Sequence, residues 1–261
     1  MATTDIVQTT GLSAAYAHSD IEQARPLLDA LDLGFKAVEA DVWAAGPALL
    51  TSHDFDKIRP NVRLRNTYLQ PAWRRLTRDG QIRADGTPVW LFVDFKTPPR
   101  RTYAALRREL LRWPGLVGKP TPRGPTRAAI HVVLTGWRPS AEAIQGERDR
   151  VVLLDGRLGD LGRITNPELM PVVSDDWSKT FTWRGEGPMP KGERDRLEAY
   201  ASEAQRHGQR LRFWATPDRA GVERDRIWGT LLEVGIGMIN TDDLQGLAAF
   251  LKSEGVPASK D

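Results

Sequence analysis

The stretch VEADVWAAGPALLTSHD (residues 38–54) predicts a strand, a tight reversal and a second strand. Glu39 and Asp41 lie two residues apart in the first strand, so both carboxylates face the same side of it. Apolar residues alternate with these acids. This favours a strand in a parallel sheet, covered on both faces, over an edge strand whose acids face solvent. His53 closes the second strand. Two carboxylates on one face of an otherwise apolar strand indicate a binding role.

The fold class follows from the order of such strands along the chain. Helical periodicity separates many of the short apolar runs, so parallel βαβ units are expected, in a doubly wound sheet or a (β/α)8 barrel. The doubly wound alternative needs a glycine-rich phosphate loop after the first strand, and AHSDIEQ (17–23) contains no glycine. We therefore predict an α/β fold of the (β/α)8 TIM-barrel type, with allowance for distortion. The apolar runs are residues 12–18, 36–43, 48–53, 89–96, 129–136, 150–156, 170–174, 211–216 and 235–241.

Domain organisation is expected to be simple. We find no linker that would split the chain, so we predict a single domain over residues 1–261 with a core from about 12 to 251. The proline-rich stretch KPTPRGPTR (119–127) is expected to be a connector, and the C-terminal residues a flexible tail.

The composition limits the classes of partner that we expect for this protein. The chain has 37 basic and 34 acidic side chains, which are interspersed, so we expect no nucleic-acid partner. It has no cysteine, which excludes disulfides, thiolate nucleophiles and cysteine-based zinc sites. No apolar run is long enough to cross a membrane, so we expect a soluble monomer with at most peripheral membrane contact. The N-terminal residues do not resemble a signal peptide. This leaves a cytoplasmic protein, or a secreted bacterial protein whose signal peptide is absent from this chain.

Polar residues gather at the predicted strand ends. In a TIM barrel the active site is built at the C-terminal ends of the strands. This rule separates the four histidines, because His18 and His53 fall at C-terminal strand ends, whereas His131 opens its strand and His207 lies in the last turn of a helix. Four successive apolar runs then supply the following side chains to one mouth: His18 and Asp20, Glu39 and Asp41, His53, and Asp94 and Lys96.

This set suits displacement at phosphorus. Three carboxylates without thiols, Glu39, Asp41 and Asp94, make an oxygen-rich site for one hard divalent cation, Mg²⁺ or Ca²⁺. Such a cation neutralises charge on phosphoryl oxygens. His18 and His53 can divide the roles of base or nucleophile and of general acid.

Several residues carry a less specific signal. Lys96 is predicted to be catalytic, as a fixed positive charge beside the phosphate, although an ion pair with Asp94 in the top layer of the barrel is the alternative. Asp20, Trp214 and Asn240 are predicted to contact the substrate from strand ends. For Trp214 and Asn240 the alternative is core packing.

In this order, the segments AHSD, VEADVW, LTSHD, LFVDFKT, FWATPD and INTDDL resemble the PI-PLC-like phosphodiesterase superfamily. That group includes glycerophosphodiester phosphodiesterases, bacterial phosphatidylinositol-specific phospholipases C and spider-type sphingomyelinase D enzymes. The resemblance implies a distorted TIM barrel, a cation on Glu39, Asp41 and Asp94, and acid–base or nucleophilic roles for His18 and His53.

Two departures from the motifs of glycerophosphodiesterases bear on which substrate is expected. Glycerophosphodiesterases commonly begin His-Arg-Gly, whereas Ser19 and Asp20 follow His18 here. Their third metal ligand is often glutamate, and here the matching strand offers Asp94. The sequence thus predicts a metal-dependent phosphodiesterase that hydrolyses, or cyclises, a glycerophosphodiester or a phospholipid headgroup. The alternative is a catalytically inactive barrel of this type that binds phosphorylated ligands.

Overall fold

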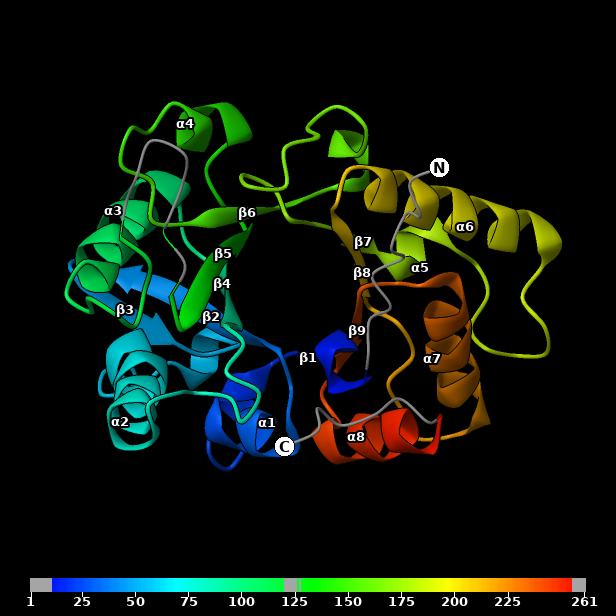
Figure 1. Cartoon of the computed structure of the whole chain (residues 1–261), viewed down its shortest axis with the longest axis horizontal. Helices are drawn as coiled ribbons and strands as arrows, with labels where there is room; N and C mark the ends of the chain where they lie inside the picture. Colours follow the sequence, from blue (N-terminus) through cyan, green and yellow to red (C-terminus); the bar gives the residue numbers. More distant parts are fainter. Residues whose placement is uncertain (1–10, 120–125, 127, 255–261) are drawn as a thin grey trace.

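The computed structural model describes residues 11–119, 126 and 128–254. Within these residues the strands form one nine-stranded sheet, which closes because β1 pairs with both β9 and β2. Eight parallel strands make the barrel, as the sequence predicted, and Figure 1 looks along it. The parallel strands are β1 (Ala15–Ala17), β2 (Ala37–Ala45), β4 (Val89–Phe95), β5 (Ile130–Gly136), β6 (Leu153–Gly156), β7 (Val172–Asp176), β8 (Arg210–Trp214) and β9 (Met238–Thr241).

Helices surround the barrel on its outside (Figure 1). The larger core fills the space between the strands and these helices. The described helices are α1 (Leu28–Leu33), α2 (Gln70–Asp79), α3 (Pro99–Leu110), α4 (Ala141–Gln145), α5 (Trp177–Thr180), α6 (Lys191–Arg206), α7 (Val222–Val234) and α8 (Leu244–Ser253).

The interior of the barrel is divided into an apolar and a polar part. A second, smaller core of inward-facing side chains includes Phe92 on β4 and Leu153 on β6. Two residues later on the same face come Asp94 and Asp155. The period of two therefore carries β4 and β6 from an apolar to a polar inward residue as each approaches its C-terminal end, where barrel sites are built.

The run 48–53 was wrongly predicted to be a barrel strand. It forms β3 (Ala48–Thr51), which pairs antiparallel with β2 in a hairpin. Only two residues separate β2 from β3, whereas a parallel crossover needs a dozen or more. The hairpin nevertheless returns the chain to the mouth, because the Ser52 N–H donates to the carbonyl of Asp41 (3.3 Å). His53, the next residue, therefore lies where the sequence predicted, but for a different reason.

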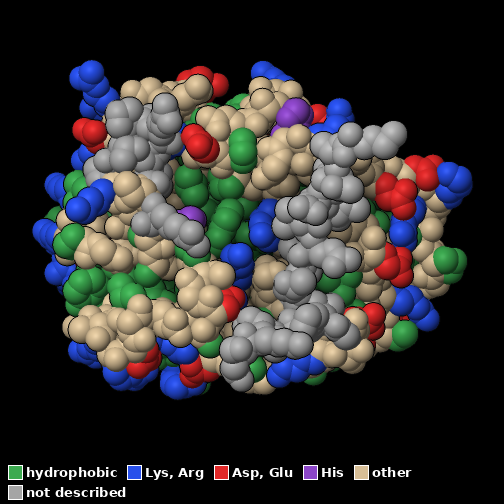
Figure 2. All heavy atoms as spheres, viewed as in Figure 1, with side chains coloured by type: hydrophobic (Ala, Val, Ile, Leu, Met, Phe, Trp, Pro, Cys, Tyr) green, Lys and Arg blue, Asp and Glu red, His purple; other side chains and the backbone are tan. Residues whose placement is uncertain are grey.

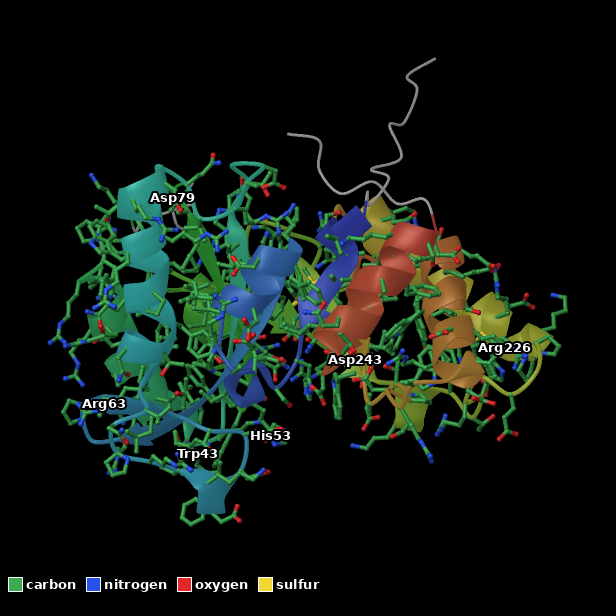
Figure 3. The ribbon with its side chains drawn as sticks, turned by 90° about the horizontal axis from the view of Figure 1, so that it is seen from below. Trp43, His53, Arg63, Asp79, Arg226 and Asp243 are labelled. Atoms are coloured by element: carbon green, nitrogen blue, oxygen red, sulfur yellow. The ribbon has the colours of Figure 1, made fainter. Side chains whose placement is uncertain are left out.

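The two ends of the barrel differ in what they present. Figure 3 shows Trp43 and His53 at one end and Asp79, the last residue of α2, at the other. On the face shown in Figure 2, basic side chains lie around the periphery and a few lie near the centre beside apolar side chains, so the described residues form no continuous basic patch there.

Two predicted features fall outside the described residues. Most of the expected connector, residues 120–125 and 127, and the expected tail from residue 255 on are among them. Among the helices that the structure describes, none has the length and apolar character needed to cross a membrane.

Candidate active site

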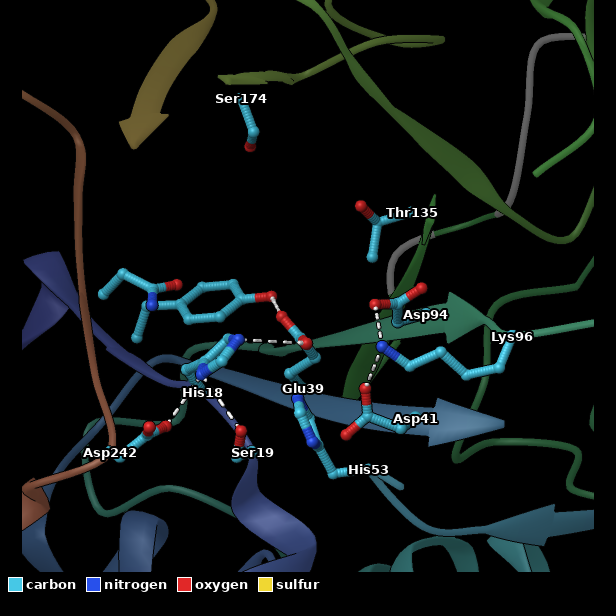
Figure 4. Close-up of polar contacts among 12 residues, drawn as sticks. His18, Ser19, Glu39, Asp41, His53, Asp94, Lys96, Thr135, Ser174 and Asp242 are labelled. Atoms are coloured by element: carbon cyan, nitrogen blue, oxygen red, sulfur yellow. Dashed lines mark hydrogen bonds and ion pairs between the residues drawn. The ribbon is translucent and has the colours of Figure 1, made fainter. Parts of the chain in front are cut away.

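Three carboxylates converge at the C-terminal mouth of the barrel (Figure 4). Glu39 and Asp41 come from β2 and Asp94 from β4, where it pairs in register with Asp41. One oxygen of each lies within 4.8 Å of the others. Oδ2 of Asp41 is buried, and no hydrogen-bond donor among the described residues reaches it. A cluster of carboxylate oxygens with a free buried acceptor fits a hard cation such as Mg²⁺ or Ca²⁺.

The environment sets the charge of these groups. Burial, together with the Glu39 charge, raises the pKa of Asp41 to about 6 and also raises the pKa of Asp94. Burial would raise the pKa of Glu39 too, but His18 and Arg212 outweigh it and lower that pKa. Three acids this close repel one another, and a cation between them would stabilise the ionised forms.

Lys96 also lies on this cluster. Its ammonium is 2.9 Å from Oδ1 of Asp41 and 2.8 Å from Oδ2 of Asp94. Burial opposes its charge, but the two carboxylates raise the pKa of Lys96 above its ordinary value. The ion pair with Asp94 is therefore present, and it holds a fixed positive charge at the mouth.

The two histidines face each other there. The ring centroids of His18 and His53 are 6.0 Å apart. Nδ1 of His18 is 2.7 Å from Oδ1 of Asp242, and its Nε2 is 3.8 Å from Oε1 of Glu39. Burial would lower the pKa of His18, but Glu39 and Asp242 raise it to about 9. Nδ1 of His53 is 3.0 Å from Oδ1 of Asp54. In both rings a carboxylate holds Nδ1, so Nε2 is the nitrogen that could take part in proton transfer.

The three predicted substrate contacts differ in placement. Trp214 is half-buried at the end of β8, with the Lys179 ammonium 5.8 Å from its ring centroid. Asp20 is fully buried, and its Oδ2 accepts the N–H of Leu27 at 2.6 Å. Asn240 is also buried, and its Oδ1 accepts from Arg212. The structure therefore brings Trp214 to the mouth, whereas Asp20 and Asn240 are buried, and one side-chain oxygen of each is held by the protein.

A buried polar network beneath the carboxylates was missed from the sequence. Arg212 lies inside the barrel with 3% of its surface exposed. Its guanidinium is within 3.5 Å of Asp155, which also accepts from Thr135. Tyr16 donates to Oε2 of Glu39. The period of two could have revealed these residues, because Tyr16 precedes His18 by two and Arg212 precedes Trp214 by two.

Comparison with known proteins shows the family of this chain. Residues 4–155 match the family model of the AIM6-like phosphodiesterase domain, more than half of the chain. The chain belongs to this family. Similar curated proteins include altered inheritance of mitochondria protein 6 of Eremothecium gossypii, 28% identical over 92% of this chain and 69% of the fungal protein. The homologue of that name in Arthroderma benhamiae is 22% identical over 95% of this chain and 86% of its own length.

The AIM6-like barrel also matches a solved structure. A glycerophosphodiester phosphodiesterase from Parabacteroides distasonis superposes with a TM-score of 0.57, over 94% of this chain and 99% of that chain. At 11% identity this shows a shared fold. Family and fold together agree with membership of the PI-PLC-like phosphodiesterase superfamily, as the motifs predicted.

Proposed function

We propose that this AIM6-like domain is a divalent-metal-dependent phosphodiesterase that acts on a glycerophosphodiester or a phospholipid headgroup. One observation carries the proposal: a cluster of three carboxylates lies at the same mouth as two histidines whose rings are 6.0 Å apart. The phosphodiesterase family and the barrel shared with a glycerophosphodiester phosphodiesterase support it.

The carboxylates and Lys96 prepare the site for a phosphate. Glu39, Asp41 and Asp94 would hold Mg²⁺ or Ca²⁺, which supplies charge neutralisation at a phosphoryl oxygen when bound. The Lys96 ammonium, held by Asp41 and Asp94, adds a second positive charge. A phosphodiester carries one negative charge, which Lys96 and a bound cation would both attract.

The histidines provide proton transfer. One accepts the proton of the attacking hydroxyl, and the other donates a proton to the leaving oxygen. The attacking group is water in a hydrolysis, or a hydroxyl of the substrate in a cyclisation. Asp242 and Asp54 fix the ring orientations through Nδ1, so each Nε2 carries out its transfer in a defined direction.

A panel of phosphodiesters tests this function. Glycerophosphodiesters and micellar phospholipids would be incubated with Mg²⁺, with Ca²⁺ and with chelator, and products followed by phosphorus NMR, which separates cyclic from open phosphates. We expect turnover with a cation and none with chelator. His131→Ala is the control, because His131 lies near the start of β5, next to Trp90 (6.0 Å between ring centroids), and should stay active. Binding of these phosphodiesters without turnover would favour the inactive-barrel alternative.

A further inference from the structure

The two carboxylate oxygens of Glu39 have different surroundings. Oε2 points into the barrel, where it accepts a hydrogen bond from Tyr16 and lies 3.3 Å from Nη1 of Arg212. Oε1 lies on the side of His18, 3.8 Å from Nε2 (Figure 4). Glu39 is buried, so its carboxylate has little room to turn. One oxygen is thus held by the protein and one is left for the mouth.

The guanidinium of Arg212 is held rigidly. Its Nε donates to Ser174 at 2.9 Å, and its Nη1 donates to Asn240 at 2.9 Å. Its Nη2 lies 3.5 Å from Oδ2 of Asp155. The ring of Tyr16 lies against it, 4.2 Å from ring centroid to guanidinium carbon. The planar, buried guanidinium has a contact on each nitrogen, so its position is fixed. The Glu39 oxygen beside it is therefore fixed as well.

The way in which Tyr16 and Arg212 hold Oε2 of Glu39 affects which cation the site prefers. Ca²⁺ takes six to eight oxygens in flexible geometry and often binds both oxygens of a carboxylate, whereas Mg²⁺ requires near-octahedral geometry and keeps several waters. With Oε2 held by Tyr16 and Arg212, Glu39 offers one oxygen. We propose that Tyr16 and Arg212 are positioning residues that restrict Glu39 to single-oxygen ligation and thereby make the site select Mg²⁺ over Ca²⁺. The inference rests on the proposed metal-dependent function.

Calorimetric titration of Mg²⁺ and of Ca²⁺, each alone, into wild type, Tyr16→Phe and Arg212→Lys tests the inference. Tyr16→Phe removes the donor and keeps the ring, and Arg212→Lys keeps the charge and removes the fork. Wild type should bind Mg²⁺ more tightly than Ca²⁺. Both variants should shift the affinity ratio toward Ca²⁺. Losing a partner that orients a metal ligand typically lowers metal affinity by about 10- to 100-fold, and we expect this loss to fall on Mg²⁺ and to be smaller for Ca²⁺. A purely structural role would lower both affinities together and leave the ratio unchanged.

Arg210→Lys is the matched control. Arg210 precedes Arg212 by two residues on β8, but its guanidinium lies 5.7 Å from the Trp90 ring centroid and contacts the Gly237 carbonyl. It should leave the ratio unchanged. Circular dichroism checks folding, and Tyr16→Phe decides the matter if Arg212→Lys does not fold.

The outcomes separate the two proposals. A wild-type protein that binds neither cation overturns the proposed function and this inference with it. A wild type that binds but prefers Ca²⁺, or a folded Tyr16→Phe variant with an unchanged ratio, overturns only the inference.

Discussion

Gly136 lies against Asp94 so closely that a Cβ on this glycine would be 1.7 Å from Oδ1 of Asp94. The glycine ends β5, the neighbour of the strand that carries Asp94, and its φ is +66°. Absence of a side chain at residue 136 therefore allows the third carboxylate to take its position at the mouth.

Gly136→Ala should weaken metal binding strongly. The added methyl group pushes Asp94 away from Glu39 and Asp41, so we expect about a 10- to 100-fold loss of Mg²⁺ affinity by calorimetry. Gly80→Ala is the control for backbone strain, because Gly80 has φ +73° and nothing within 4 Å of its Cβ position. Each variant should lose about 1–2 kcal/mol of folding free energy from the left-handed conformation. Equal metal affinity in the two variants would contradict the steric argument.

Asp41→Asn and Glu39→Gln should also lose metal affinity while the barrel stays folded. Neither residue supplies apolar packing, and the amide oxygen that Glu39→Gln introduces can still accept from Tyr16 and Arg212 inside the barrel. Removing the Asp41 charge should even stabilise the protein without metal, because burial and the Glu39 charge raise the pKa of Asp41 to about 6. Metal titration and thermal melting in chelator measure the two effects. Unchanged affinity in both variants would mean that the carboxylates do not hold the cation.

His18→Ala and His53→Ala should each reduce the rate by about 10²–10⁴-fold, the usual contribution of positioned acid–base catalysis. The double variant should lose little more than the worse single variant, since groups that act as a unit are not additive. A nitrophenyl phosphodiester, whose leaving group needs no proton, should rescue the variant that lacks the general acid and not the other. Steady-state rates on both substrate types measure this. Near-normal rates in either single variant would contradict the site.

Asp20 should make the stability depend on pH. Burial raises the pKa of its carboxyl from 3.8 to about 7, so the folded protein keeps a proton that the unfolded chain has already lost. Rising pH between these two values therefore destabilises the fold. Asp20→Asn is neutral at every pH and can still accept the Leu27 N–H. Its gain in unfolding free energy over wild type should be about 2–3 kcal/mol larger at pH 8 than at pH 5.

Urea denaturation at the two pH values measures this difference. Asp85→Asn is the opposite control. Burial favours the neutral form of Asp85, but its bonds to Arg83 and Thr87 outweigh this and hold its pKa well below the ordinary value. Removing that charge should therefore destabilise the protein at both pH values. A pH-independent effect of Asp20→Asn would show that the Asp20 carboxyl is ionised in the fold.

Local sequence patterns predicted much of the candidate site. Strand periodicity placed Glu39 and Asp41 on one face, and the position of Asp94 and Lys96 near the end of their apolar run placed them at the same mouth. The same reasoning failed for the run 48–53, because an apolar run does not reveal whether its partner strand is parallel. It also failed for Asp20, whose neighbours fold over it and bury it.

The sequence by itself determined which side chains face inward and at which end of each strand they lie, because alternation along a strand is a local property of the backbone. Only the tertiary structure decided which of them meet. Closure of the sheet between β1 and β9 brings Asp242 to His18 across 224 residues, and curvature of the barrel brings Arg212 on β8 to Glu39 on β2. Such contacts depend on how the strands tilt and close around a common axis. No local sequence pattern encodes the distance between side chains on different strands.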